Sequence, residues 1–430
     1  MDSMYYLLIS FLVFLIIGVP ISFCLLASSI VYIFFSGNFE VFINIVPIKL
    51  FRSTDSFIFI AVPLFILMGK LMNASGLTMD LINVADLFVG RLKGGLAHVN
   101  VVVSMLFGGC SGTAISDTSA IGTVLIPEMV DRGYEKDFSA AVTAASSTMG
   151  PIIPPSMAFI LYGASSGLSI STLFIAGVIP GILVGLFQMV VVSIYAYKRN
   201  YPKRENIIPI REALRIMKRG LWGLLLPIII LGGIIFGIFT PTEAAVIAVV
   251  YSLFVSIIVY KERNIKKYLN ILIEAGVEAG SIMIIIATTS LFGWVLANEQ
   301  IPIKFAQMVT SFVGAPWQAL ILINIFLLII GMFMDNGPAI ILLVPIVVPL
   351  FKALGIDPIQ GALITCVNLT TGLSTPPVGC CLFAASSIAK ESFTKISKAI
   401  VPFLLANIVV VILITYFPVF TLWLPKILGK

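Results

Sequence analysis

Two helix-breaking segments lie within otherwise apolar sequence, at matching places in the two halves of the chain. Gly150–Pro155 reads GPIIPP and Gly372–Pro377 reads GLSTPP, 222 positions further on. Sliding residues 127–180 onto 349–402 without a gap places four of the five prolines of the first window on prolines of the second. Such a match indicates an internal duplication of the chain.

Helix breaks of this kind can occur only at certain places in a membrane protein. In lipid, every backbone N–H and C=O group needs a partner, so unwound backbone survives only where it is buried in protein or lines a polar cavity. Matched Gly/Pro interruptions in two halves of a chain are therefore the best sequence indication of a transporter's central binding site. The two breaks predict such a site between them.

The composition shows that the surrounding sequence belongs in a membrane. Of 430 residues, 59% are hydrophobic and 11% are charged, and the mean hydropathy is +1.11. This is too apolar for a water-soluble core and indicates a polytopic membrane protein. The N-terminal apolar run lacks a basic leader and a cleavage site, so it reads as membrane span and not as signal peptide.

Apolar runs predict ten crossings, at 4–19, 21–36, 56–73, 138–167 (broken), 172–197, 221–239, 241–260, 276–297, 359–389 (broken) and 399–424.

Two pairs of shorter apolar arms lie between these crossings. They are Leu96–Phe107 with Thr118–Val130 and Trp317–Phe333 with Ala339–Phe351, and each pair meets at a polar tip that contains glycine. Arms of about 12 to 17 residues are mostly too short to cross a bilayer unaided. They predict re-entrant helical hairpins.

The predicted fold is an all-α polytopic membrane protein with two inverted-topology repeats, each with a re-entrant helical hairpin and a broken transmembrane helix. The first repeat covers 1–197 and the second 220–430, joined by a basic cytoplasmic linker at 198–219. Their parts are scaffold helices at 4–75 and 221–260, hairpins at 96–130 and 317–352, and broken helices at 138–167 and 359–389. Residues 38–55, 212–219 and 261–275 read as helices lying in the membrane interface.

Charge placement supports this topology. With the N-terminus outside, only six of the 26 lysines and arginines fall outside, so 20 fall on the cytoplasmic side, as the positive-inside rule requires. The first hairpin then opens to the cytoplasm and the second to the outside. The net charge of +6 is explained by short loops between spans, so we do not expect nucleic-acid binding.

The densest polar sequence at membrane depth is GGCSGTAISDTSAIG, residues 108–122. It supplies hydroxyls, freed backbone carbonyls and the carboxylate of Asp117, which are the oxygen ligands that hard cations prefer. The alternative is that its serines and threonines bond only to their own helices. An aspartate at the bilayer centre costs roughly 2.5–3.5 kcal/mol, so Asp117 and Asp335 each indicate a site.

The second hairpin tip and the two breaks supply the rest of the predicted chamber. The tip reads MDNGP at 334–338, and the breaks add hydroxyls and half-helix termini that present free N–H and C=O groups. No lysine or arginine is expected at this depth. An anionic substrate is therefore expected to be held by helix N-termini, hydroxyls and bound cations.

Over essentially its full length the sequence resembles the large membrane subunit of tripartite ATP-independent periplasmic (TRAP) transporters. The residues that carry the resemblance are GVP at 18–20, PLFILMG at 63–69, GGCSGTAISDTSAIGTVLIP at 108–127, MGPIIPPS at 149–156, GIFTPTEAA at 237–245, MFMDNGPAIILLVPI at 332–346 and GLSTPPVG at 372–379.

This resemblance implies a sodium-driven importer of an organic acid, of the sialic acid or C4-dicarboxylate class, in a bacterial inner membrane with the N-terminus periplasmic. It implies an elevator-type motion, a small four-helix membrane subunit as a separate chain, a periplasmic substrate-binding protein, and no organic cofactor. The implied sodium ligands are Ser111, Gly112, Thr113, Ser116, Asp117, Ser147, Gly150, Asp335, Asn336, Gly337, Thr371, Gly372 and Thr375. The implied substrate contacts are Ser111, Thr113, Ser156, Asp335 and Asn336.

The sequence leaves one close alternative open, a stand-alone sodium/dicarboxylate symporter with the same hairpin architecture. An intramembrane hydrolase using Ser111 or Ser116 is disfavoured because neither His98, the single histidine, nor any lysine lies near these serines in sequence. The absence of a Gly-rich phosphate loop argues against ATP hydrolysis. A passive channel is disfavoured because hairpins meeting at depth would occlude it.

Overall fold

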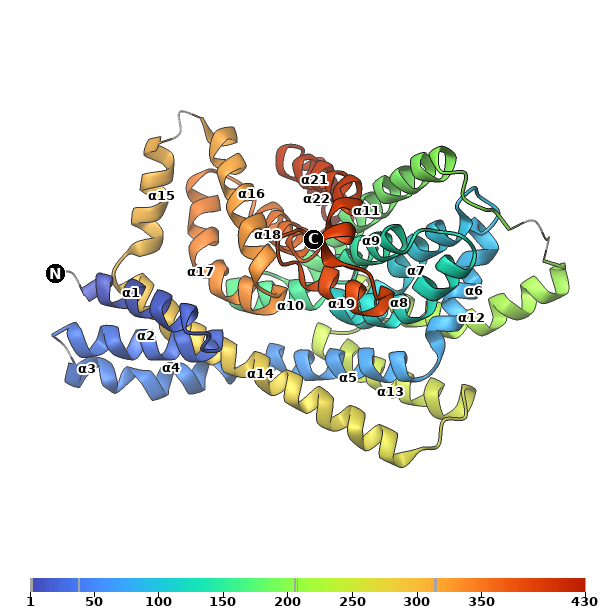
Figure 1. Cartoon of the computed structure of the whole chain (residues 1–430). Coiled ribbons are helices and arrows are strands. Elements are labelled where there is room, and N and C mark those ends of the chain that lie inside the picture. The colour runs from blue at the N-terminus through green and yellow to red at the C-terminus, as the bar shows by residue number, and fades with distance from the viewer. Residues whose placement is uncertain (1–2, 38, 205, 207, 313–314, 430) are drawn as a thin grey trace.

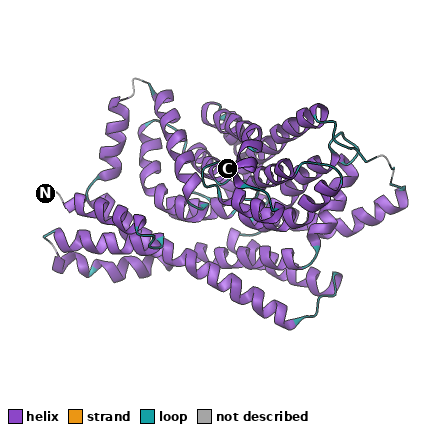
Figure 2. Ribbon diagram, in the orientation of Figure 1, coloured by secondary structure: helices purple, strands orange, loops and turns teal. Residues whose placement is uncertain are grey.

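The computed structural model describes residues 3–37, 39–204, 206, 208–312 and 315–429. The side chains of Ser3, Cys110, Ser111, 305–306 and 309–312 also lie outside the described part. Within these limits the chain is built of helices joined by loops and contains no strand, as Figure 2 shows. The prediction of an all-α protein is confirmed.

The helices of the first half range in length from 5 residues in α3 to 29 residues in α11. They are α1 (Ser3–Ile16), α2 (Ile21–Phe35), α3 (Phe39–Ile43), α4 (Ile45–Thr54), the 3₁₀ turn η1 (Phe57–Ile60), α5 (Ala61–Ala74), α6 (Leu77–Val89), α7 (Gly95–Ser111), α8 (Ala114–Asp131), α9 (Lys136–Ser146), the 3₁₀ turn η2 (Ser147–Met149), α10 (Met157–Ser166) and α11 (Ile170–Lys198).

The second half begins after a non-helical connection. Its elements are α12 (Ile210–Ile235), α13 (Pro241–Phe254), the π-helical turn η3 (Val255–Val259), α14 (Ile265–Asn298), α15 (Ile301–Phe312), α16 (Pro316–Phe333), α17 (Asn336–Ala353), α18 (Pro358–Gly372), α19 (Cys380–Ala389), α20 (Phe393–Ala399), α21 (Val401–Tyr416) and α22 (Val419–Ile427).

Seven of the described helical segments are long and apolar enough to cross a membrane, or eight if α20 and α21, bent by 50° at their junction, form one span. Five of the seven match predicted crossings. The helices α1 and α2 have only 14 and 15 residues. The other two segments are the hairpin arms α16 and α17, each 18 residues or about 27 Å long, so these arms are not too short to cross.

The helices form two layers (Figure 1). The lower layer in that view consists of α1–α5 with α13 and α14, and α14 contacts α2, α4 and α5 along its length. The other layer holds the two hairpins α7–α8 and α16–α17, together with the broken helices α9–α10 and α18–α19. The predicted site lies where these layers meet.

Two of the expected interfacial helices are not separate elements. Residues 265–275 form the first part of α14, which runs without interruption over 34 residues, about 51 Å. Residues 212–219 form the first turns of α12, so the predicted linker is helical at its end. Both helices begin before their apolar spans because their polar N-terminal turns carry good helix formers and no glycine or proline that would stop them. The helices α3 and α4 do form short elements within 38–55.

The duplication seen in the sequence also appears in the helix bounds. The helices α8 and α17 are both 18 residues long and begin 222 positions apart, at Ala114 and Asn336. The helices α9 and α18 begin at Lys136 and Pro358, which is the same offset. Packing crosses between the halves, since α8 contacts α19 and α10 contacts α17. Each break is followed by a second half-helix that supports the hairpin of the other half.

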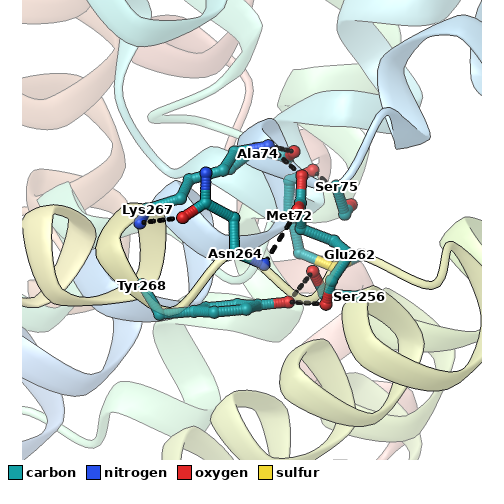
Figure 3. Close-up of polar contacts among 8 residues, drawn as sticks. All are labelled: Met72, Ala74, Ser75, Ser256, Glu262, Asn264, Lys267 and Tyr268. Atoms are coloured by element: carbon teal, nitrogen blue, oxygen red, sulfur yellow. Dashed lines mark hydrogen bonds and ion pairs between the residues drawn. The ribbon is translucent and has the colours of Figure 1, made fainter.

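A polar cluster fixes the start of α14 against the end of α5 (Figure 3). Lys267 Nζ donates to the Ala74 carbonyl oxygen at 2.8 Å and lies 2.7 Å from Glu262 Oε2. The hydroxyls of Ser256 and Tyr268 are 2.7 Å apart. The Lys267 bond joins the start of α14 to the end of α5, and the Ser256–Tyr268 pair joins it to η3.

Candidate transport site between the hairpin tips and the helix breaks

The first hairpin tip lies against the first break. The helix α7 ends at Ser111, Gly112 takes the left-handed conformation with φ +68°, and Thr113 is the extended residue before α8. A Cβ atom on Gly112 would lie 3.5 Å from the Pro155 carbonyl oxygen, and one on Gly108 would lie 3.0 Å from the Gly150 Cα atom. Glycine allows this close approach of hairpin and break.

Oxygen atoms of the first tip converge on Gly150. Asp117 is fully buried in the first turn of α8, and a Cβ atom on Gly150 would overlap its Oδ2 atom. The Thr113 carbonyl oxygen lies 3.3 Å from the same point. A carboxylate and a carbonyl beside unwound backbone are a ligand set that fits a hard cation such as Na⁺.

The second tip meets the second break in the same way. Gly331 of α16 packs on Gly372 at the end of α18, and the Gly379 N–H donates to the Met332 carbonyl oxygen at 3.1 Å. Asn336 Nδ2 donates to Thr370 Oγ1 at 2.7 Å. The Asn336 Oδ1 atom is buried and has no hydrogen-bond partner among the described residues, which leaves an oxygen ready to accept from or coordinate a ligand.

Asp335 is placed at the start of α17 by its own side chain. Its Oδ1 atom accepts a hydrogen bond from the Asn336 N–H at 2.8 Å, which makes it the N-cap of that helix. The residue is exposed and lines the cavity described below. Gly337 is also a predicted ligand. A Cβ atom added to it would meet only Leu161 Cδ1, at a distance of 3.5 Å.

The predicted hydroxyl ligands at the breaks bond to their own helices. Ser147, Thr371 and Thr375 each donate to the carbonyl oxygen four residues earlier, at 2.7 to 2.8 Å. Such bonding of a hydroxyl to its own helix is the alternative that the sequence also allows. It uses the single proton of each hydroxyl and leaves its lone pairs free to coordinate a cation.

Ser156 follows the first break, and Ser111 ends α7. Ser156 is buried as the N-cap of α10, accepts from the Phe159 N–H at 3.3 Å and donates to the Pro151 carbonyl oxygen. It does not line the cavity described next, so a substrate contact at Ser156 stays a prediction. The side chain of Ser111 is outside the described part of the chain, and its predicted role is not placed by the structure.

A cavity of about 380 Å³ joins the two tips. The first hairpin contributes Thr113, Ser116 and Ser119, and the second contributes Asp335. The facing wall belongs to the other helix layer, with Lys70 from α5 and Glu278 from α14. Residues of both predicted repeats and of both layers therefore meet in one chamber.

The chamber continues along α8. A second cavity of about 470 Å³ shares Ser116 and Ser119 with the first and extends to Thr123 and Gly76. Asn73 Nδ2 donates to Ser116 Oγ at 2.9 Å between the two cavities, linking α5 to the first hairpin. The path leads from the tips to the end of α5, the side that the charge distribution assigns to the cytoplasm.

The expectation that no lysine lies at the depth of the site is wrong. Lys70 lines the cavity, with its Nζ atom 3.1 Å from Glu278 Oε2 and 3.6 Å from Glu274 Oε2. Lys70 lies near the end of the predicted span 56–73, and the partners that hold it are more than 200 residues away in sequence. The signal was nonetheless present, since an ionisable residue inside an apolar helix indicates a functional site by default.

The sequence is similar to those of known membrane transport proteins. Residues 8–420 match the model of the tripartite ATP-independent periplasmic transporter family, DctM component. The chain is 41% identical over 382 residues to the C4-dicarboxylate TRAP transporter large permease protein DctM of Pseudomonas aeruginosa, covering 89% of each chain. It is 38% identical over 428 residues to the sialic acid TRAP transporter permease protein SiaT of Haemophilus influenzae, covering 99% of this chain and 69% of that one.

Two further similarities extend the comparison. The uncharacterized protein YgiK of Salmonella typhimurium is 41% identical over 419 residues, covering 97% of this chain and 96% of that protein. The crystal structure of the YdaH transporter of Alcanivorax borkumensis, described as having an unusual topology, superposes with a TM-score of 0.65 over 86% of this chain and 88% of that one. At 14% sequence identity this likeness concerns the fold alone.

Proposed function

The chain belongs to the DctM component family of tripartite ATP-independent periplasmic transporters, and from that premise we propose that it imports an organic acid together with sodium ions. It is the large membrane subunit of such a transporter, not an enzyme. The observation that carries the proposal is the single chamber in which Thr113, Ser116 and Asp335 of the two hairpin tips meet.

The proposed substrate is an organic anion. Relatives are named for sialic acid, for C4-dicarboxylates and for isethionate, all of which are organic anions at neutral pH. The cavity between the tips, about 380 Å³, is large enough for small acids of this kind. Asn336 and the hydroxyls of the first tip supply neutral hydrogen-bonding groups for such a substrate.

Sodium is the proposed coupling ion. Asp117 with the Thr113 carbonyl oxygen would hold one ion at Gly150, and Asn336 with Asp335 would hold one at the second tip. Each sodium ion that moves inward gains about 2.3 kcal/mol per 100 mV of membrane potential. Two ions would therefore drive net uptake of a monoanion.

The proposed movement is that of an elevator. The hairpins and broken helices would move as one body against the layer formed by α1–α5, α13 and α14, with the two repeats in inverted orientation and the N-terminus in the periplasm. The present conformation, with the path along α8 open beside Gly76, would then be inward-facing. We propose that a small membrane subunit braces the fixed layer in the bacterial inner membrane and that a periplasmic binding protein delivers the substrate.

Uptake by reconstituted protein tests this proposal. Proteoliposomes would contain the chain with its small partner subunit, and candidate binding proteins would be loaded with sialic acid or succinate. Sodium gradient and voltage are varied separately. Uptake should require inward sodium and a binding protein, and should increase with negative interior voltage. Full activity of the chain alone would favour the stand-alone symporter, and sodium-independent uptake would contradict the coupling.

A further inference from the structure

We propose that Lys70 is the cationic contact for the carboxylate of the substrate and that Glu278 competes with the substrate for it. This inference rests on the proposed function, because it assigns a residue to the acid that the site would carry. It adds a positively charged contact from the facing helix layer to a chamber whose other predicted contacts come from the hairpins and breaks.

The position of Lys70 supports a role in the cavity. It is the only charged residue in α5, whose other residues are apolar except for Asn73. Its side chain is 27% exposed, and that exposure faces the cavity that Asp335 lines. Keeping an ammonium group among apolar helices is costly, and such residues face a water-filled cavity or a partner.

The two glutamates on α14 hold Lys70 in a way that permits exchange. Glu274 and Glu278 are one helical turn apart, so both side chains lie on the same face of α14. Only Glu278 lines the cavity; Glu274 lies beside it and is 65% exposed. A substrate carboxylate could replace Glu278 while Glu274 still positions the ammonium group.

The strengths of these interactions favour exchange. A partly exposed lysine–glutamate pair contributes little, typically about 0 to 1 kcal/mol, because water screens it and long side chains lose freedom. An enclosed carboxylate of the substrate that also bonds to the hairpins would compete well for the same ammonium group. Lysine suits this task because its flexible point charge has no fixed binding geometry.

The charges in the cavity explain why the exchange would depend on sodium. Lys70, Glu278 and Asp335 give the cavity lining a formal sum of −1, which repels an anion. Sodium bound at the second tip would offset Asp335. The substrate would then displace Glu278 from Lys70 only when that ion is bound. In the absence of sodium, the protein would therefore bind the acid weakly.

The decisive test compares variants whose effects have opposite sign. In the proteoliposome assay with sialic acid and succinate as probes, Lys70→Gln should raise the KM for the transported acid about tenfold or more, because a charged hydrogen bond is lost. Lys70→Arg should restore part of the affinity. Glu278→Gln should leave the KM unchanged or lower it, because it removes the competitor.

Lys267→Gln is the matched control. Lys267 carries a comparable pair with Glu262 and also touches α5, but it does not line the cavity. The KM of the Lys267→Gln variant should match that of the wild type. Melting temperatures in detergent identify variants that fold poorly. A wild-type KM in Lys70→Gln, or equal increases in Lys70→Gln and Glu278→Gln, would show a purely structural pair and overturn the inference. Absence of uptake by the wild type would instead contradict the proposed function.

Discussion

Gly331 in α16 packs directly on Gly372 at the end of α18, so closely that a Cβ atom on Gly372 would overlap the Gly331 backbone. The first half contains the corresponding contact, in which a Cβ atom on Gly108 would lie 3.0 Å from the Gly150 Cα atom. Each hairpin is therefore joined to the break of its own half through paired glycines. This close approach allows the polar tips to reach the unwound backbone.

Gly372→Ala should disrupt the second of these contacts. The added methyl group has to displace the Gly331 backbone, and overpacking of this kind typically costs about 1–3 kcal/mol. We expect a lower melting temperature in detergent and a loss of uptake. Gly232→Ala is the control, because a Cβ atom there meets nothing within 4 Å, and it should be neutral or slightly stabilising in its helix. Equal melting temperatures for Gly372→Ala and wild type would contradict the packing argument.

Asp117→Asn should weaken sodium binding at the first tip. The substitution keeps the shape of a fully buried side chain but removes the negative charge that a cation needs. The sodium concentration for half-maximal uptake should rise about tenfold or more. Asp131 is exposed at the far end of α8, and Asp131→Asn should leave this sodium concentration unchanged. A sodium dependence in Asp117→Asn like that of the wild type would remove this residue from the proposed sodium site.

Asp335→Asn separates the charge of the second tip from its capping role. Asparagine caps helices about as well as aspartate, so the start of α17 should be preserved and the melting temperature should stay near the wild-type value. Uptake should nevertheless be abolished, because the second tip loses its carboxylate. Asp335→Ala should lose uptake too, with about 1 kcal/mol of additional destabilisation from the lost cap. Wild-type uptake by either variant would take Asp335 out of the site.

Joining α5 to the first hairpin should stop transport. Asn73 Nδ2 and Ser116 Oγ lie 2.9 Å apart, so the double variant Asn73→Cys with Ser116→Cys brings two thiols within reach of a short bifunctional thiol-reactive cross-linker. If the hairpin layer moves relative to α5, cross-linking should block uptake and a cleavable linker should restore it on reduction. The single-cysteine variants are the controls. Uptake that persists in fully cross-linked protein would exclude an elevator motion between these elements.

A polar cluster outside the membrane spans should give a pH-dependent contribution to stability. Burial raises the pKa of Glu135, but the hydrogen bond from the Tyr201 hydroxyl and the Arg199 guanidinium outweigh it and lower the pKa below its ordinary value of 4.5. The ionised carboxylate therefore stabilises the fold above about pH 4.5, and this stability is lost as the pH falls through the lowered pKa. Glu135→Gln should melt below the wild type at pH 7, with a difference that shrinks towards pH 4. A constant difference across this range would contradict the assignment.

Much of the site could be predicted because its elements are close in sequence. The hairpin tip with Asp117 and the break at Gly150 are only about 30 residues apart, and the 222-residue offset repeats that arrangement around Asp335 and Gly372. Proline and glycine interrupt helices through their own backbone chemistry, which does not depend on the rest of the fold. The arms predicted from local sequence to begin at Thr118 and Ala339 therefore lie within four residues of the observed helix starts, Ala114 and Asn336.

The sequence by itself determined that this chain is a helical membrane protein with two matched hairpins and two matched breaks, since hydropathy and backbone chemistry act locally. Only the tertiary structure decided that α14 is one continuous helix and that it lies along α5. That packing places Lys70 beside Glu278 and forms the wall facing Asp335. The physical reason is that ion pairs and cavity walls depend on which faces of distant helices come together, and an apolar helix with a single lysine is compatible with many neighbours.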